Sequence, residues 1–351
     1  MDRIAKAPQE ERAELFRRSA GVLRLERSPA IIEKDFWVCW ALHRLFDVVR
    51  FRPQLIFKGG TSLSKAYNAV ERFSEDVDLS LSRRDLGFAD SRDPEELGIS
   101  GKESQCRIEA LIGACRQAVA DRLLPGLRAD FAAVIGPGGW NVELDVIDPQ
   151  TVIFTYPRSD LAGDFPAIIR PAIRLEMGAR SDDWPAEERE IRPYAAEALP
   201  TAFSMAASCR VRVLDARRTF WEKATLLHAE HHRPADKALA AGMSRHYYDL
   251  YQLSRQEIGQ QALERGDLLT RVVAHKRWFF ASAWAHYETA MPGSFHLVPR
   301  EDQAVMLRTD YSRMREMIFG EAPAWEHIVQ GLRELEGQIN KSQQTSLSQE
   351  L

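Results

Sequence analysis

The sequence predicts an α+β fold, in which a mixed sheet with helices is followed by a helical domain. Short apolar or alternating runs, interleaved with stretches of helical spacing, occupy the region from residue 51 to residue 215. After residue 215 the hydrophobic residues recur at helical spacing alone. The chain has 351 residues, of which 45% are hydrophobic and 28% are charged, so it is globular in composition and long enough for two or three packed units.

We expect four segments along the chain. Residues 1–50 are expected to form a helical lead-in, 51–215 the mixed core, 216–339 the helical C-terminal domain and 340–351 a disordered tail. In the lead-in, Ser28-Pro29 opens a helix whose apolar residues continue at helical spacing to Leu45. The tail is expected because NKSQQTSLSQEL is polar and contains few bulky apolar residues.

The mixed core is expected to begin with a strand, a glycine turn and a helix. The apolar run of residues 55–57 leads into Gly59-Gly60, and helical spacing follows from Thr61 to Val70. The alternating sequence DVDLSL over residues 76–81 predicts the next strand. The rest of the core is expected to be an exposed insertion over Ser82–Lys102, a helix over Glu103–Leu123, and strands over Trp140–Ile147 and Ala172–Met177.

The C-terminal domain is expected to be wholly helical, because the hydrophobic pattern after Asp215 has helical spacing throughout. The predicted helices span Arg217–His231, Ser244–Leu253, Leu263–His275, Trp278–Tyr287, Asp302–Ile318 and Ala324–Ile339.

Charge, hydropathy and cysteine content exclude several classes of protein. With 47 Lys and Arg against 51 Asp and Glu, the net charge of -4 excludes a uniformly basic nucleic-acid coat. No window approaches the roughly 18 consecutive apolar residues of a membrane span, and we expect a cytoplasmic protein without membrane contact. The four cysteines form no CxxC pair, so reduced thiols are expected in place of zinc ligands or disulfides.

The first candidate site is the glycine turn between the predicted strand and helix. Two glycines let the backbone approach a ligand closely, and the following helix offers free amides to a phosphate. A GxxxxGK motif does not fit these residues, so this is not a P-loop. The alternative interpretation is that the two glycines only allow a tight turn before the helix. The residues of interest are Lys58, Gly59, Gly60, Thr61, Ser62 and Lys65.

The second candidate is the acidic pair Asp76 and Asp78. Side chains at i and i+2 of a strand share one face, so two like charges repel there unless a cation lies between them. Carboxylates that bind Mg²⁺ remove that cost, whereas an edge strand with solvated acids is the alternative. A third carboxylate would come from Glu176 in AIRLEM or from Asp145, which alternates with Glu143 in WNVELDV.

Two predicted helices carry further candidates. Lys223 lies at the margin of an apolar stripe, where its ammonium either extends to solvent or contacts a phosphate group. Asp249 lies four residues after Arg245, so a simple helical ion pair is the alternative to a functional role.

In combination, five segments resemble the nucleotidyltransferase toxins of the abortive-infection AbiEii/AbiGii group, which includes the MenA-type toxins. The resemblance covers most of residues 55–253 and is specific because the segments occur in the same order. The segments are FKGGTSLSKAY, ERFSEDVDLSL, IRLEMGARS, RTFWEKATLLHAE and SRHYYDLYQL.

The resemblance implies a DNA polymerase β-like nucleotidyltransferase core that uses a nucleoside triphosphate with Mg²⁺ or Mn²⁺. It implies that the glycine turn, from Gly59 to Ser62, holds the triphosphate and that Asp76 and Asp78 bind the metals. Lys223 would contact the nucleotide phosphates and Asp249 would complete the site. From its position, Lys65 would lie near the leaving phosphates, and the resemblance of IRLEMGARS favours Glu176 over Asp145 as the third carboxylate.

The same resemblance implies a toxin of a toxin–antitoxin or abortive-infection system that acts in phage defence. Its acceptor would be RNA, foremost the 3′ end of tRNA, and a cognate antitoxin encoded by a neighbouring gene would neutralise it. Alternatives are a nucleotide sensor or partner-binding module without transfer, or transfer to a protein or small-molecule hydroxyl. Candidate RNA-binding cations are Arg83, Arg84, Lys102, Arg107, Arg271, Lys276 and Arg277.

Ser74 is a candidate regulatory residue because it lies two positions before Asp76. Its phosphorylation would place about two negative charges beside the metal ligands and would oppose metal or triphosphate binding. A serine that only hydrogen-bonds the turn before the strand is the alternative interpretation.

Overall fold

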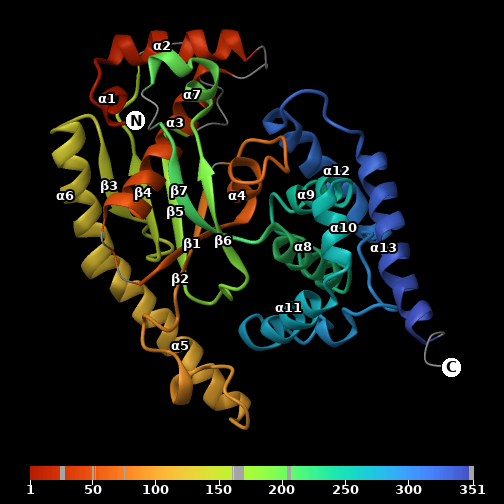
Figure 1. Cartoon of the computed structure of the whole chain (residues 1–351). Helices are drawn as coiled ribbons and strands as arrows, with labels where there is room; N and C mark the ends of the chain where they lie inside the picture. Colours follow the sequence, from red (N-terminus) through yellow and green to blue (C-terminus); the bar gives the residue numbers. More distant parts are fainter. Residues whose placement is uncertain are drawn as a thin grey trace. The chain divides into compact units, whose positions relative to one another are not determined.

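The computed structural model places the chain in two compact units (Figure 1). The first comprises Met1–Asn68 and Phe73–Leu214, and the second comprises Ala69–Arg72 and Asp215–Leu351. The structure describes residues 1–23, 28–49, 51, 53–74, 76–159, 161, 170–203 and 207–347, with the side chains of 342–347 excepted. The α+β fold that the sequence predicts is confirmed.

A seven-stranded mixed sheet forms the framework of the first unit (Figure 1). Its strand order is β3-β4-β5-β2-β1-β7-β6, so the centre of the sheet combines strands distant in sequence. Strand β2 pairs antiparallel with β1 and parallel with β5, while β1 and β7 are parallel. The strands are β1 (Leu55–Lys58), β2 (Asp76–Leu81), β3 (Asn141–Leu144), β4 (Thr151–Thr155), β5 (Ala172–Gly178), β6 (Ala186–Ile191) and β7 (Cys209–Leu214).

Helix α3 (Pro29–His43) packs against β5 and β7 of the sheet. Its N-terminus is capped by Ser28, whose hydroxyl accepts a hydrogen bond from the amide of Ala30 at 3.2 Å. Trp37 and Trp40 are fully buried, and Trp40 contacts Phe131 of α6 with ring centroids 4.6 Å apart. The helices of the expected lead-in therefore pack in the same unit as the sheet.

The other helical segments of the first unit surround the sheet and its connections. Helix α5 is capped by the Ser100 hydroxyl, which accepts from the amide of Glu103 at 3.1 Å. The segments are α1 (Asp2–Ala5), α2 (Gln9–Val22), α3 (Pro29–His43), η1 (Arg44–Val48), α4 (Gly59–Lys65), η2 (Asp90–Arg92), α5 (Gly101–Ala118), η3 (Val119–Leu123), α6 (Leu124–Ile135), α7 (Tyr194–Ala198) and η4 (Pro200–Ala202).

The second unit is helical and begins where β7 ends. Asp215 caps α8, because its carboxylate accepts a hydrogen bond from the amide of Arg217 at 2.8 Å. The short segment Ala69–Arg72 joins this unit through a bridge between Arg72 and Ile318. The helical segments are α8 (Ala216–His231), α9 (Ser244–Ser254), α10 (Glu257–Leu263), α11 (Gly266–Phe279), η5 (Tyr287–Thr289), α12 (Glu301–Met314), η6 (Arg315–Met317) and α13 (Trp325–Leu347).

Several local predictions differ from the structure. The helix predicted over Trp278–Tyr287 is wrong: α11 ends at Phe279, and His286 has a left-handed φ of 46° that a helix does not accommodate. Helix α4 already begins at Gly59 and ends at Lys65, earlier than the predicted end at Val70. Helix α13 continues to Leu347, into the expected tail, while residues 348–351 lie outside the described residues.

No helix within the described part of the chain combines the length and the apolar character that crossing a membrane requires.

Candidate functional site

The glycine turn follows directly from strand β1. Gly59, the first residue of α4, has a φ of +77°, which side-chain-bearing L-residues rarely adopt. A Cβ atom at Gly59 would lie 1.9 Å from the Oδ2 atom of Asp78. The turn therefore requires glycine for its backbone conformation and for the space that the Asp78 carboxylate occupies.

The two aspartates lie on one face of β2, as the alternation predicts. Asp76 and Asp78 are half-buried, while Val77 between them is fully buried on the other face. In the sheet register, Asp78 is opposite Lys58 of β1 and opposite Glu176 of β5. Pairing of β2 with β5 therefore places a third carboxylate directly beside Asp78, although these residues are far apart in the sequence.

Arg174 is a site residue that the sequence reasoning missed. It is opposite Asp76 in the register, and its Nε atom lies 3.7 Å from Asp76 Oδ1 and 3.3 Å from Glu176 Oε1. A second nitrogen, Nη1, donates a hydrogen bond to Asp145. The i, i+2 spacing of Arg174 and Glu176 in AIRLEM was the signal, but its meaning depends on the strand pairing.

The two alternative third carboxylates have different surroundings. Asp145 accepts hydrogen bonds from the amides of Ile147 and Asp148 and from Arg174, and these lower its pKa. Burial and then the negative charges of Asp76 and Asp78 raise the pKa of Glu176. Asp145 therefore accepts hydrogen bonds within a turn, whereas the Glu176 carboxylate is repelled by the negative charges of Asp76 and Asp78.

The chemistry of this cluster fits a divalent cation. Asp76, Asp78 and Glu176 provide an all-oxygen donor set, which hard cations such as Mg²⁺ and Mn²⁺ prefer. Burial is the largest cause that raises the pKa of Glu176, and repulsion from Asp76 and Asp78 adds to it, while Arg174 opposes the shift. A bound cation would relieve that repulsion.

The polar residues of the glycine turn are directed into the protein. The Thr61 hydroxyl donates to the carbonyl of Asp76, and the Ser62 hydroxyl donates to the carbonyl of Gly59 at 2.9 Å. The Thr61 bond fixes the turn against β2 and the Ser62 bond lies within α4, so ligand contacts are left to the backbone. Lys58 is the exception, with its Nζ atom 4.0 Å from Asp78 Oδ1.

Lys65 requires a correction, because it does not face the glycine turn as a phosphate ligand would. Its side chain is buried, and its Nζ atom lies 2.8 Å from Asp35 Oδ1 of α3. The same ammonium lies 3.6 Å from the ring centroid of Tyr194. Lys65 therefore fastens α4 to the core of the first unit.

Lys223 and Asp249 meet within the second unit. Asp249 is fully buried and pairs with Lys223 at 2.8 Å and with Arg72 at 2.7 Å. Burial raises the pKa of Asp249, but the charges of Arg72 and Lys223 outweigh it, so the pKa lies well below its ordinary value. Arg72 was not singled out from the sequence. The roles in nucleotide binding and catalysis that the resemblance implies for Lys223 and Asp249 stay predictions.

Three of the candidate RNA-binding cations have acidic or carbonyl partners. Arg83 pairs with Asp93 and Glu95, Arg107 pairs with Glu96 and Glu103, and Lys276 donates a hydrogen bond to the carbonyl of Glu222 at 2.7 Å. The remaining four, Arg84, Lys102, Arg271 and Arg277, are exposed. Ser74 is half-buried ahead of β2, and its regulatory role stays a prediction.

Comparison with known proteins identifies a matching family and a similar solved structure. The chain matches the family model described as "Nucleotidyl transferase AbiEii toxin, Type IV TA system" over residues 40–331. Among solved structures it is similar to MenT4, the nucleotidyltransferase toxin Rv2826c from Mycobacterium tuberculosis H37Rv. That match has a TM-score of 0.49 and 17% sequence identity, and it covers 93% of this chain and 88% of that chain. No relative among curated proteins matches the chain.

Proposed function

Because the chain belongs to the AbiEii family of nucleotidyltransferase toxins of type IV toxin–antitoxin systems, we propose that it transfers a nucleoside monophosphate from an NTP to RNA. The acceptor is the 3′ hydroxyl of tRNA. The observation that carries the proposal is the register of β2 and β5, which puts Glu176 beside Asp78 on the face that also carries Asp76.

The three carboxylates form the reaction centre of this proposal. When bound there, Mg²⁺ or Mn²⁺ supplies charge neutralisation at the α-phosphate and acidifies the attacking hydroxyl. Asp76, Asp78 and Glu176 hold the cation, and Arg174 of β5 orients Glu176 on its own strand and Asp76 on the neighbouring strand β2. The reaction is an in-line displacement in which the acceptor oxygen forms a bond to the α-phosphorus and pyrophosphate leaves.

The glycine turn positions the triphosphate beside these carboxylates. With no side chain at Gly59 or Gly60, backbone amides at the start of α4 approach phosphate oxygens closely. Thr61 and Ser62 support the turn through their hydrogen bonds to backbone carbonyls. Lys58 supplies a positive charge next to Asp78.

A partner follows from the family. A type IV toxin–antitoxin system pairs the toxin with an antitoxin, and we propose that the antitoxin is encoded by a neighbouring gene and that the pair acts in phage defence. The short neighbouring reading frame, expressed together with this chain, should restore growth to cells that the toxin arrests.

The acceptor is tested by supplying several candidates together. Purified protein receives α-labelled NTPs, Mg²⁺ and total tRNA, and a parallel reaction contains tRNA whose 3′ diol has been oxidised with periodate. We expect label on the intact tRNA and none on the oxidised tRNA. Label on the protein, or on added small-molecule alcohols, would instead identify another hydroxyl acceptor. NTP binding without pyrophosphate release would favour a sensor that does not transfer.

A further inference from the structure

A second cluster of metal-ligand side chains lies in the first unit, away from the glycine turn. It contains His43, the last residue of α3, Asp47 in η1, and Cys209, the first residue of β7. One ligand atom from each residue lies within 4.8 Å of the other two. The cysteine pattern predicted no zinc ligand, because Cys209 is distant in sequence from both partners.

The three side chains already interact with one another. His43 Nδ1 lies 2.8 Å from Asp47 Oδ2. Burial is the largest cause that raises the pKa of the Cys209 thiol, and the neighbouring Asp47 carboxylate, which the thiol hydrogen-bonds, raises it further. Cys209 is a free cysteine and is fully buried, whereas the side chains of His43 and Asp47 are 26% and 37% exposed. The cluster therefore has a buried sulfur on one side and access to solvent on the other.

A helical ion pair alone would not explain this arrangement. His43 and Asp47 are four residues apart, so their contact by itself is ordinary for a helix surface. The buried Cys209 thiol adds a third possible metal ligand. The cluster therefore offers one nitrogen, one oxygen and one sulfur atom. Zinc is the divalent ion that commonly combines these ligands.

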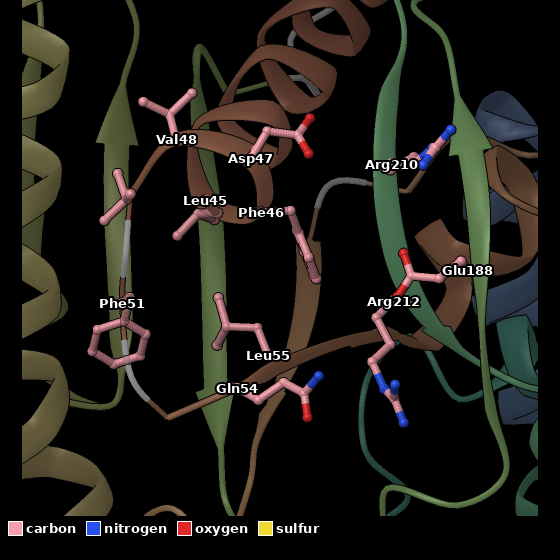
Figure 2. A pocket seen from close by; sticks show the side chains of 11 residues that line it. Leu45, Phe46, Asp47, Val48, Phe51, Gln54, Leu55, Glu188, Arg210 and Arg212 are labelled. Atoms are coloured by element: carbon pink, nitrogen blue, oxygen red, sulfur yellow. The ribbon is translucent and has the colours of Figure 1, made fainter.

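One residue of the cluster, Asp47, also lines a cavity that has room for a further ligand. Strands β1 and β7 pair at Phe57 and Val213, and a cavity of about 570 Å³ lies between Leu55 at the start of β1 and Arg210 and Arg212 of β7. Asp47 lines this cavity, and Figure 2 shows its carboxylate on η1 with Arg210 and Arg212 on the neighbouring strand. The cavity lies by the start of β1, whereas Asp78 pairs with Lys58 at its end.

We propose that His43, Asp47 and Cys209 bind one zinc ion. The imidazole nitrogen, the carboxylate oxygen and the thiolate sulfur fill three positions, and water fills the fourth on the side of the cavity. Three protein ligands with one exchangeable position is the arrangement of an open zinc site. Binding releases the thiol proton to solvent, so zinc affinity rises with pH.

Cobalt(II) provides a probe that separates this site from the three carboxylates. The full-length protein is stripped with a chelator and titrated with Co²⁺, and the thiolate-to-cobalt charge-transfer absorption is recorded. We expect this absorption to saturate at one equivalent and to disappear when Zn²⁺ is added. The carboxylate cluster of Asp76, Asp78 and Glu176 contains no sulfur and produces no such band.

Two cysteine variants identify the ligand. Cys209→Ser should lose the charge-transfer band, whereas Cys106→Ser, which changes an exposed free cysteine, should keep it. His43→Gln and Asp47→Asn alter partly exposed positions and should weaken Co²⁺ binding at least about tenfold, with an unchanged circular dichroism spectrum. These two variants keep the test decisive even where Cys209→Ser lowers stability.

The proposal is overturned by any of three results. One is the absence of a thiolate band in the wild-type protein, and another is a band that persists in folded Cys209→Ser. The third is a band that Cys106→Ser abolishes, which would place the metal at the exposed thiol.

Discussion

Gly59 and Asp78 pack closely together, one from each motif of the proposed site. The backbone of Gly59 lies so near Asp78 that its missing side chain makes the space for a carboxylate oxygen. This contact links the position of the triphosphate to the position of the metal ligands. A change at either residue should therefore disturb both.

Gly59→Ala should slow transfer through displacement of Asp78. Its Cβ atom would lie 1.9 Å from Oδ2, so the carboxylate must move by about 1 Å, a displacement that costs roughly a hundredfold in rate. Gly98→Ala is the matched control, because Gly98 has a φ of +88° and no heavy atom within 4 Å of the added Cβ. Both variants should lose about 1–2 kcal/mol in urea unfolding. Equal transfer rates in the two variants would contradict this contact.

Glu176→Gln should stabilise the metal-free protein at neutral pH. The pKa of Glu176 is raised by burial and by Asp76 and Asp78, so its ionisation destabilises the fold as pH rises through that pKa. The gain in melting temperature should therefore shrink as pH falls below the ordinary glutamate pKa of about 4.3. Glu143→Gln, an exposed position on β3, serves as the control and should show no gain. A destabilised Glu176→Gln at neutral pH would refute the proposed repulsion.

Some site residues could be predicted from the sequence and others could not. Asp76 and Asp78 follow from alternation within six residues, because the period of a strand is local. The role of Arg174 depends on the register between β2 and β5, which local periodicity does not specify. Lys65 has the spacing of a phosphate ligand, yet its partner is Asp35 on a helix earlier in the chain.

At the scale of elements, helices α8 and α9 are joined by a buried cluster of charges. The buried carboxylate of Asp249 in α9 pairs with Lys223 of α8 and with Arg72 of the segment Ala69–Arg72. The Asp249 carboxylate is the negatively charged partner of both cations, so both cations lose this partner if the carboxylate is removed. The cluster therefore stabilises the second unit and orients Lys223.

Asp249→Asn should destabilise the second unit by about 3–5 kcal/mol, because two buried cations lose their anion. The pKa of Asp249 is lowered, so its contribution is present at neutral pH and is lost as pH falls below about 4. Urea unfolding at several pH values measures this effect. Asp267→Asn, which breaks the exposed pair with Arg265, should have little effect. An unchanged free energy of unfolding in Asp249→Asn would contradict the stabilising role of this cluster.

Physical causes also explain where the predicted strands and helices differ from those in the structure. Strand β6 was missed because AEEREI is charged and lies at the edge of the sheet, where its outward residues are exposed. Strand β4 was missed because TVIFT is a short apolar run that periodicity alone does not assign. The helix predicted over Trp278–Tyr287 is wrong because α11 ends at Phe279, and the left-handed backbone conformation of His286 is not encoded in the hydrophobic pattern.

At the scale of the whole molecule, a net charge of -4 limits how the proposed RNA acceptor can be bound. Arg83 and Arg107 are neutralised by acidic neighbours, so they contribute less to phosphate binding than their number suggests. The proposed RNA contact therefore depends on a few exposed cations, among them Arg84 and Lys102. Few phosphate contacts predict a shallow dependence of tRNA binding on salt concentration.

The proposal that the carboxylates of β2 and β5 are the reaction centre is tested most directly by single-turnover transfer of label from α-labelled and γ-labelled NTPs. Wild-type protein and Glu143→Gln should transfer the α-label to tRNA and release the γ-label as pyrophosphate. Asp78→Asn and Glu176→Gln should lose several kcal/mol of transition-state stabilisation and slow at least about a hundredfold, while circular dichroism shows them folded. Wild-type rates in both folded variants would contradict the assignment of this site.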